Sequence, residues 1–159
     1  MIKTRFLSNL FLSFIWLAVT GNFTFENFVF GFLLGFILMW LIATNRREDK
    51  YFYRAPKLIY FIFYFIYELI KANLQVAYDV VTPRFYMKPG IIQIPLTAKS
   101  DLEITLLANL ISLTPGTLSL DVSNDREVLY VHAMYVSDKN EFIQSIKNGF
   151  EKKLLEILR

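Results

Sequence analysis

Two long uncharged apolar segments follow one another in the first third of the chain. Residues 6–25 and 27–45 carry no charged side chain, and Glu26 alone separates them. The remaining chain is too short to bury both segments in water, whereas a helix in a bilayer satisfies its own backbone hydrogen bonds. The pattern therefore predicts a membrane-embedded helical hairpin, with its turn at residues 21–24.

Positive charges bracket the predicted hairpin. Lys3 and Arg5 precede it, and Arg46 and Arg47 follow it, so both ends are expected in the cytoplasm. A cleavable signal peptide is the alternative for the first segment, but a second apolar segment follows too closely to favour it. Each arm is short, because some 16 residues at about 1.5 Å each span roughly 24 Å. A thin local membrane, or packing against other subunits, would accommodate this length.

Two glycines in the second segment, Gly31 and Gly35, are four residues apart and share one helix face. Glycines at this spacing allow another backbone to approach closely, although such pairs are also common in membrane helices by chance. We expect them to serve helix packing, either within the hairpin or against a partner.

A third helix is predicted to begin at Pro56 and to end near Val81, because a proline suits the first turn of a helix. Residues 58–67 are apolar on every face. The second half is amphipathic, and its polar stripe consists of Glu68, Lys71, Gln75 and Asp79. A membrane-embedded Glu68 paired with Lys71 would suggest a proton relay. The steady rise in polarity favours a stripe that faces water or a subunit groove.

The third helix raises a question of sidedness. If the hairpin begins and ends in the cytoplasm and the third helix spans fully, residues 90–159 lie outside. Either the first two helices do not both span, or the third lies tilted at the interface. The basic connection at 46–57 favours a cytoplasmic C-terminal part.

The last 70 residues have the texture of a small globular domain. Ser100 and Glu103 form a capping box that opens a helix, and Pro115 and Gly116 end it. Residues 117–122 then alternate between apolar and polar, as a strand does. The expected order is β-α-β-β-α, over residues 91–96, 101–113, 117–122, 127–136 and 138–158.

Composition agrees with a membrane protein. Apolar residues make up 55% of the 159, and the mean hydropathy of +0.39 exceeds that of an ordinary soluble domain. The net charge of +3 is small, and no basic face for nucleic acid is formed. We predict an α+β membrane protein with transmembrane helices followed by a small domain. The predicted parts are a hairpin and basic loop (1–55), a third membrane helix and linker (56–89) and a cytoplasmic β-α-β-β-α domain (90–159).

Candidate catalytic and metal-binding residues are few. The only histidine, His132, lies on an alternating strand, where packing is the expected role. Asp121, Asp125 and Glu127 suggest a cation site, but their spacing does not match a calcium loop and fits a solvated turn. The sequence has no phosphate-binding glycine loop, nucleophile elbow or HExxH motif. We expect no enzymatic activity, no cofactor and no bound metal.

Residues 107–118, LANLISLTPGTL, resemble the central signature of the E-type subunits of the Mrp (Mnh, Sha) multisubunit Na⁺/H⁺ (cation/proton) antiporters. Residues 68–73, ELIKAN, resemble that family's third-helix motif. Shorter matches lie at 99–101, 123–126 and 130–133. Asn124 and Tyr135 depart from the family, in which acidic residues are expected or frequent, and this weakens any cation site at these turns.

The resemblance implies an accessory role. In that family the complex exchanges cytoplasmic Na⁺ for external protons, large antiporter-like subunits are the expected ion carriers, and the small E-type component is needed for assembly and activity. The expected partners are therefore other membrane subunits and the lipid bilayer, with Na⁺ and H⁺ handled by the complex. The residues expected to serve packing and assembly are Gly31, Gly35, Glu68, Lys71, Asn73, Thr114, Pro115 and Gly116.

Two other functions stay open at the level of sequence. The chain could be a freestanding membrane-anchored adaptor whose cytoplasmic domain binds a protein partner. It could also carry ions by itself, which would require transport by the isolated chain.

Overall fold

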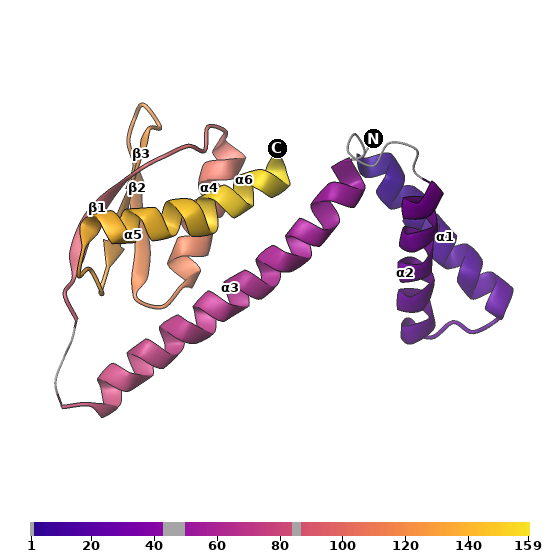
Figure 1. Cartoon of the computed structure of the whole chain (residues 1–159), viewed down its shortest axis with the longest axis horizontal. Helices are drawn as coiled ribbons and strands as arrows, with labels where there is room; N and C mark the ends of the chain where they lie inside the picture. The colour runs from indigo at the N-terminus through magenta and orange to yellow at the C-terminus, as the bar shows by residue number, and fades with distance from the viewer. Residues whose placement is uncertain (1, 43–49, 84–86) are drawn as a thin grey trace. The chain divides into compact units, whose positions relative to one another are not determined.

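The computed structural model describes residues 2–42, 50–83 and 87–159, which form two compact units (Figure 1). The first unit is Met1–Pro56 and the second is Lys57–Arg159. Arg46 and Arg47, on which the predicted orientation depends, lie outside the described residues.

Helices of the length and apolarity that a membrane span requires occur twice in the described parts of the chain. They are Phe25–Ile42 and Tyr51–Val81, and a shorter apolar helix covers Thr4–Thr20. Most large apolar side chains of Thr4–Thr20 and Phe25–Ile42 are exposed, which is the distribution expected of helices that face lipid.

The first unit is a hairpin of α1 (Ile2–Thr20) and α2 (Phe25–Ile42). Its two glycines lie where α2 approaches α1 closely. A Cβ atom on Gly31 would stand 2.8 Å from Cδ1 of Trp16, and one on Gly35 would stand 2.5 Å from Oδ1 of Asn9. The glycine pair thus contacts α1 within the hairpin.

Polar side chains occupy the interior of this hairpin. Asn9 and Ser13 are fully buried. The Asn9 amide donates to the hydroxyl of Tyr51 at 3.1 Å, and the Ser13 hydroxyl donates to the Asn9 carbonyl at 2.8 Å. Tyr51 and Phe52 are buried together against Met39.

The third helix, α3 (Lys50–Val81), begins earlier than predicted. The sequence placed its first turn at Pro56, but Pro56 lies inside the helix and the first turn is at Lys50. The earlier turns are stabilised by the burial of Tyr51 and Phe52, a tertiary contact that local sequence does not reveal. The end at Val81 agrees with the prediction.

The second unit contains a three-stranded antiparallel sheet in the order β1-β3-β2, so the α+β class is confirmed. Its strands are β1 (Gly90–Pro95), β2 (Thr117–Val122) and β3 (Val128–Ala133). β3 is shorter than the predicted 127–136. Besides the part of α3 from Lys57 onward, the described residues of this unit form four helical elements: α4 (Asp101–Leu113), α5 (Lys139–Ile146), the π-helix η1 (Lys147–Glu151) and α6 (Lys152–Leu158).

One face of the sheet forms the core. Alternate residues of β1 and β3 point inward and pack against α4 and the helical run α5–η1–α6. The most buried members of this core are Ile92, Ile94, Leu107, Ile111, Leu129 and Val131. Figure 1 shows α4 and α5 beside the sheet and α3 as one long helix.

Two buried carboxylates bind backbone amides near the start of α4. The predicted capping box is present: Ser100 accepts from the amide of Glu103, whose side chain accepts from the amide of Ser100. Glu103 also pairs with Arg159 at 3.0 Å, and this guanidinium lowers the pKa of Glu103 to about 2. Glu151, which is 1% exposed, accepts from the backbone amides of Thr97 and Ala98.

Candidate functional site

One face of α3 packs on the α+β domain. Phe61, Tyr64 and Phe65 join the domain core, where both Tyr64 and Phe65 make edge contacts with Phe150. Spacings of three and four residues continue this face through Glu68, Lys71 and Gln75. The polar stripe predicted from the sequence therefore faces the chain's own domain.

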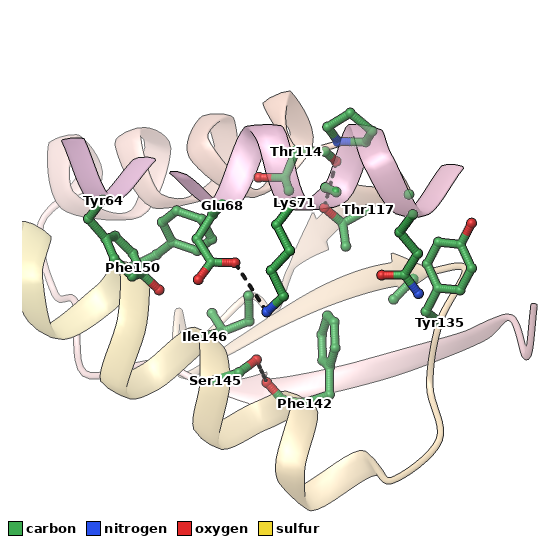
Figure 2. A pocket seen from close by; sticks show the side chains of 15 residues that line it. Tyr64, Glu68, Lys71, Thr114, Thr117, Tyr135, Phe142, Ser145, Ile146 and Phe150 are labelled. Atoms are coloured by element: carbon green, nitrogen blue, oxygen red, sulfur yellow. Dashed lines mark hydrogen bonds and ion pairs between the residues drawn. The ribbon is translucent and has the colours of Figure 1, made fainter. Parts of the chain in front are cut away.

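A groove of about 240 Å³ lies between this face and the domain. Figure 2 shows Glu68 and Lys71 projecting into it from α3, opposite the α5–η1 helices. The α4–β2 turn and the end of β3 form its other wall. The lining residues used below are Tyr64, Glu68, Lys71, Thr114, Gly116 and Tyr135.

Glu68 and Lys71 form the ion pair of the groove. The Lys71 ammonium lies 3.8 Å from a Glu68 carboxylate oxygen. The Glu68 side chain is 24% exposed, whereas that of Lys71 is 64% exposed. An exposed pair one helical turn apart contributes at most about 0.5 kcal/mol. The pair therefore adds little to the stability of the helix.

The turn at 114–117 ends α4 and enters β2. The Thr114 hydroxyl donates to the Leu110 carbonyl at 3.0 Å, and the Thr117 hydroxyl donates to the Ile111 carbonyl at 2.6 Å. Because the Thr114 amide bonds to the Ile111 carbonyl, the Leu110 carbonyl loses its helical donor and accepts from the Thr114 hydroxyl instead. Gly116 has a φ of 88°, which disfavours other residues, and the ring of Tyr135 packs against it.

Tyr64 of α3 packs against the π-helix η1. Gly149 lies under the Tyr64 hydroxyl, so closely that a Cβ atom there would clash with it. Lys153 stands 4.1 Å above the Tyr64 ring centroid. A π-turn widens the helix by one residue per turn and is frequent at functional sites. Here the π-helix lies where α3 packs against the domain.

Tyr135 lies at the far end of the groove, beside Asp79 of α3. Asp79 is 5% exposed. Its carboxylate, together with burial, raises the pKa of Tyr135 to about 12, so this phenol stays neutral in the physiological range. Tyr135, which differs from the acidic residue frequent in the family, therefore contacts Gly116 of the signature.

The structure brings together five of the eight predicted site residues. Glu68 and Lys71 meet the turn of Thr114, Pro115 and Gly116 across the groove. Gly31 and Gly35 lie in the other unit, inside the hairpin. Asn73 is exposed on a different side of α3, and its amide donates to the Leu69 carbonyl.

Sequence reasoning missed Gly149 and Ser145, which come from the last helical run. A lone glycine inside an amphipathic helix was the available signal for Gly149, because glycine there usually marks a close approach.

The other candidate residues lie away from the groove. His132 is half-buried on β3, opposite Ile91 and Leu118. Asp125 accepts from the amide of Glu127 within the β2–β3 turn. Within residues 2–42, 50–83 and 87–159, no three His, Cys, Asp or Glu side chains are grouped to hold a metal ion.

Long exposed apolar helices attached to an α+β domain define a membrane-associated protein. Comparison with known proteins then gives the family. A family model described as "Na+/H+ ion antiporter subunit" (MNHE) matches residues 9–157. The chain belongs to this family of Na⁺/H⁺ antiporter subunits, which confirms the resemblance seen in the sequence, and it is located in the membrane.

Relatives and solved structures match between about two thirds and nearly all of this chain. The E1 subunit of the Na⁺/H⁺ antiporter of Staphylococcus epidermidis is 40% identical over 96% of both chains. A chain of an archaeal respiratory complex, the membrane-bound sulfane sulfur reductase, is 32% identical, with a TM-score of 0.55 over 94% of this chain and 96% of that one. A chain of the Mrp complex from Dietzia sp. DQ12-45-1b is 30% identical, with a TM-score of 0.50 over 64% of this chain and 96% of that one.

Proposed function

We propose that the chain is a non-catalytic accessory subunit of a multisubunit Na⁺/H⁺ antiporter in the cell membrane, and that it contributes to assembly of the complex. One observation carries this proposal. The polar stripe of α3 lines a groove against the chain's own domain, so an almost entirely apolar face is left for lipid or other subunits. That face consists of Leu58, Ile59, Ile62, Phe63, Ile66, Ile70 and Leu74, each at least 46% exposed.

The same observation bears on where α3 lies. A helix that carries a domain along its side from Phe61 to Gln75 cannot be surrounded by lipid. An amphipathic helix in the plane of the interface buries its apolar face and keeps its polar face wet. In this placement α1 and α2 supply the two membrane passes, and the domain stays on the cytoplasmic side. The question of sidedness then disappears.

The groove supports a binding role for its residues rather than ion transport. Glu68 and Lys71 neutralise each other at a half-open site next to a turn whose hydroxyls are already bonded. Such a site suits a polar group of a neighbouring subunit. Na⁺ and H⁺ are then carried by the partner subunits.

Purification tests the proposal. The tagged chain, extracted in mild detergent, should bring several very hydrophobic subunits with it, and its deletion should lower Na⁺ tolerance. The comparison is the same chain carrying Glu68→Gln in the groove, the proposed contact with a neighbouring subunit, which should retain fewer of these partners. A stable monomer combined with unchanged Na⁺ tolerance would instead identify a freestanding adaptor. Transport by the reconstituted single chain would identify an ion carrier.

Sidedness can be tested separately. The chain contains no cysteine, so a single cysteine at Asn124 reports without background. Asn124 lies in the exposed β2–β3 turn. An impermeant maleimide should label it only from the cytoplasmic side, and labelling only from outside would contradict the proposed orientation.

A further inference from the structure

A second depression, of about 220 Å³, lies beside α3 where the last helical run crosses it. Its lining differs from that of the groove because it is rich in lysine. The residues are Lys57, Tyr60, Asn148, Lys152, Lys153 and Glu156. Three lysines and one glutamate leave an excess of two positive charges.

The contacts hold the lysines around the depression. The Lys57 ammonium lies 2.9 Å from Glu156, and that of Lys153 lies 3.3 Å from the Asn148 carbonyl. Lys152 is exposed at the rim. Because Lys57 is paired with Glu156 and the Lys153 ammonium also lies over the Tyr64 ring, Lys152 is the lysine whose charge is most accessible to a phosphate-sized anion.

The position of the depression on α3 indicates the source of that anion. Tyr60, Tyr67 and Tyr78 point within about 20° of one another at ~100° per residue, and each is more than half exposed. A row of tyrosines along the edge of an apolar face is typical of the headgroup level of a membrane. Phe63, which is 68% exposed, lies next to this row on the apolar side.

We propose that the depression lined by Lys57, Lys152 and Lys153 binds the phosphate of an anionic membrane lipid. The acyl chains of that lipid run along Phe63 and the apolar face of α3. The Tyr60 hydroxyl lies at the boundary between the two. This inference rests on the proposed placement of α3 at the membrane surface and is independent of the antiport role.

The experiment uses the full chain in detergent, with equal amounts of phosphatidylglycerol and phosphatidylcholine, and counts bound lipids by native mass spectrometry. Phosphatidylglycerol should be preferred. Lys152→Gln should reduce the preference about fivefold, because each lysine near a lipid surface contributes about that factor. Glu156→Gln removes the one acidic lining residue and should raise the preference by a similar factor.

Lys139→Gln is the matched control. Lys139 is an exposed lysine at the start of α5, roughly 20 Å along the helical run from Lys152, and its loss should change nothing. Equal preferences in the Lys152→Gln and wild-type chains would overturn the proposal. Displacement of the lipid by millimolar inorganic phosphate would also overturn it, since the site would then be a general anion site.

Placement is measured on its own, so the two failures can be told apart. A spin label at Phe63→Cys should be accessible to oxygen and protected from a water-soluble relaxant in vesicles. A label in water would refute the placement of α3 and the lipid site together. A label in lipid without a headgroup preference would refute only the lipid site.

Discussion

The hairpin and the α+β domain have opposite, inside-out distributions of polar and apolar side chains between interior and surface. The hairpin buries Asn9, Ser13, Gly31 and Gly35 beside only two large apolar side chains of its own, Leu17 and Met39, and exposes most of its phenylalanines and leucines. The domain buries isoleucine, leucine and valine and exposes most of its charges. Each distribution is stable only in its own solvent: lipid makes close packing and internal hydrogen bonds the main forces, and water makes apolar burial the main force.

α3 belongs to both patterns at once. Its domain-facing side contributes Phe61 and Tyr64 to a water-type core, whereas its other side exposes Phe63 and Ile66 as the hairpin does. In the proposed placement, this helix lies at the boundary between lipid and water. Mutations that test the contrast should act oppositely in the two regions.

The largest effect is expected where the hairpin depends on close approach. Gly31→Leu would drive a side chain into Trp16, whose Cβ and Cδ1 stand 3.0 and 2.8 Å from the added Cβ position. Even Gly31→Ala should cost about 1–3 kcal/mol as overpacking, and leucine should open the hairpin. Thermal unfolding in detergent followed by tryptophan fluorescence measures it, because both tryptophans lie in this hairpin. Leu33→Ile on the exposed face is the control, and equal melting of the two variants would contradict the inside-out description.

The domain should be most sensitive to the removal of a buried apolar side chain. Leu107→Ala leaves a cavity at a fully buried core position and should destabilise the domain by about 2–5 kcal/mol. Leu33→Ala in the hairpin, where the leucine is 55% exposed, should change stability by less than about 0.5 kcal/mol in detergent. Hydrogen exchange of the β3 amides measures the first variant and exchange of α2 the second. Similar losses in both would show that apolar burial stabilises the hairpin as much as it stabilises the domain.

The sequence predicted the water-type region better than the membrane-type one. Alternation at 117–122 and the capping box at Ser100 are local patterns, and the structure has β2 and the start of α4 at these positions. The start of α3 at Lys50 depends on the burial of Tyr51 in the hairpin, which is a tertiary contact. The π-helix at 147–151 likewise has no periodic signature.

For the candidate site, the sequence predicted the residues but not that they lie close together in the fold. The stripe of Glu68 and Lys71 follows from helical periodicity alone. Periodicity does not say what a stripe faces, and the 114–116 turn that it faces is more than 40 residues away in the chain. The sequence therefore left water and a subunit groove as the alternatives, and the chain's own domain was not among them.

The ion pair between Glu103 and the half-exposed Arg159 should give a smaller, pH-dependent effect. The pKa of Glu103 is lowered from 4.5 to about 2, chiefly by Arg159 and then by backbone amides. A lowered folded-state pKa gives stability that is present above pH 4.5 and is lost as the pH falls toward 2. Glu103→Gln should cost about 1–2 kcal/mol at pH 7, since Arg159 is half exposed and the cap is weakened.

Urea unfolding of the full chain in detergent, repeated between pH 2 and 7, measures this effect. The two chains should converge in stability near pH 2, and Glu141→Gln, which removes an exposed carboxylate of α5, should follow the wild type. A constant difference across the whole range would mean that Glu103 acts through shape rather than charge.

The smallest effect on stability, and the most informative on function, is expected at Glu68. Its pair with Lys71 is long, at 3.8 Å, and the lysine is 64% exposed, so Glu68→Gln should leave the melting temperature of the isolated chain nearly unchanged. If Glu68 binds a basic group of a partner subunit, the variant leaves that group unpaired in the complex, at a cost of several kcal/mol when buried. The yield of assembled complex and its Na⁺/H⁺ exchange should then fall together, and Glu68→Asp should restore part of both. Glutamine keeps the shape of glutamate but cannot exchange a proton. Exchange lost from a normally assembled Glu68→Gln complex would therefore place this carboxylate in the ion pathway and refute its assembly role.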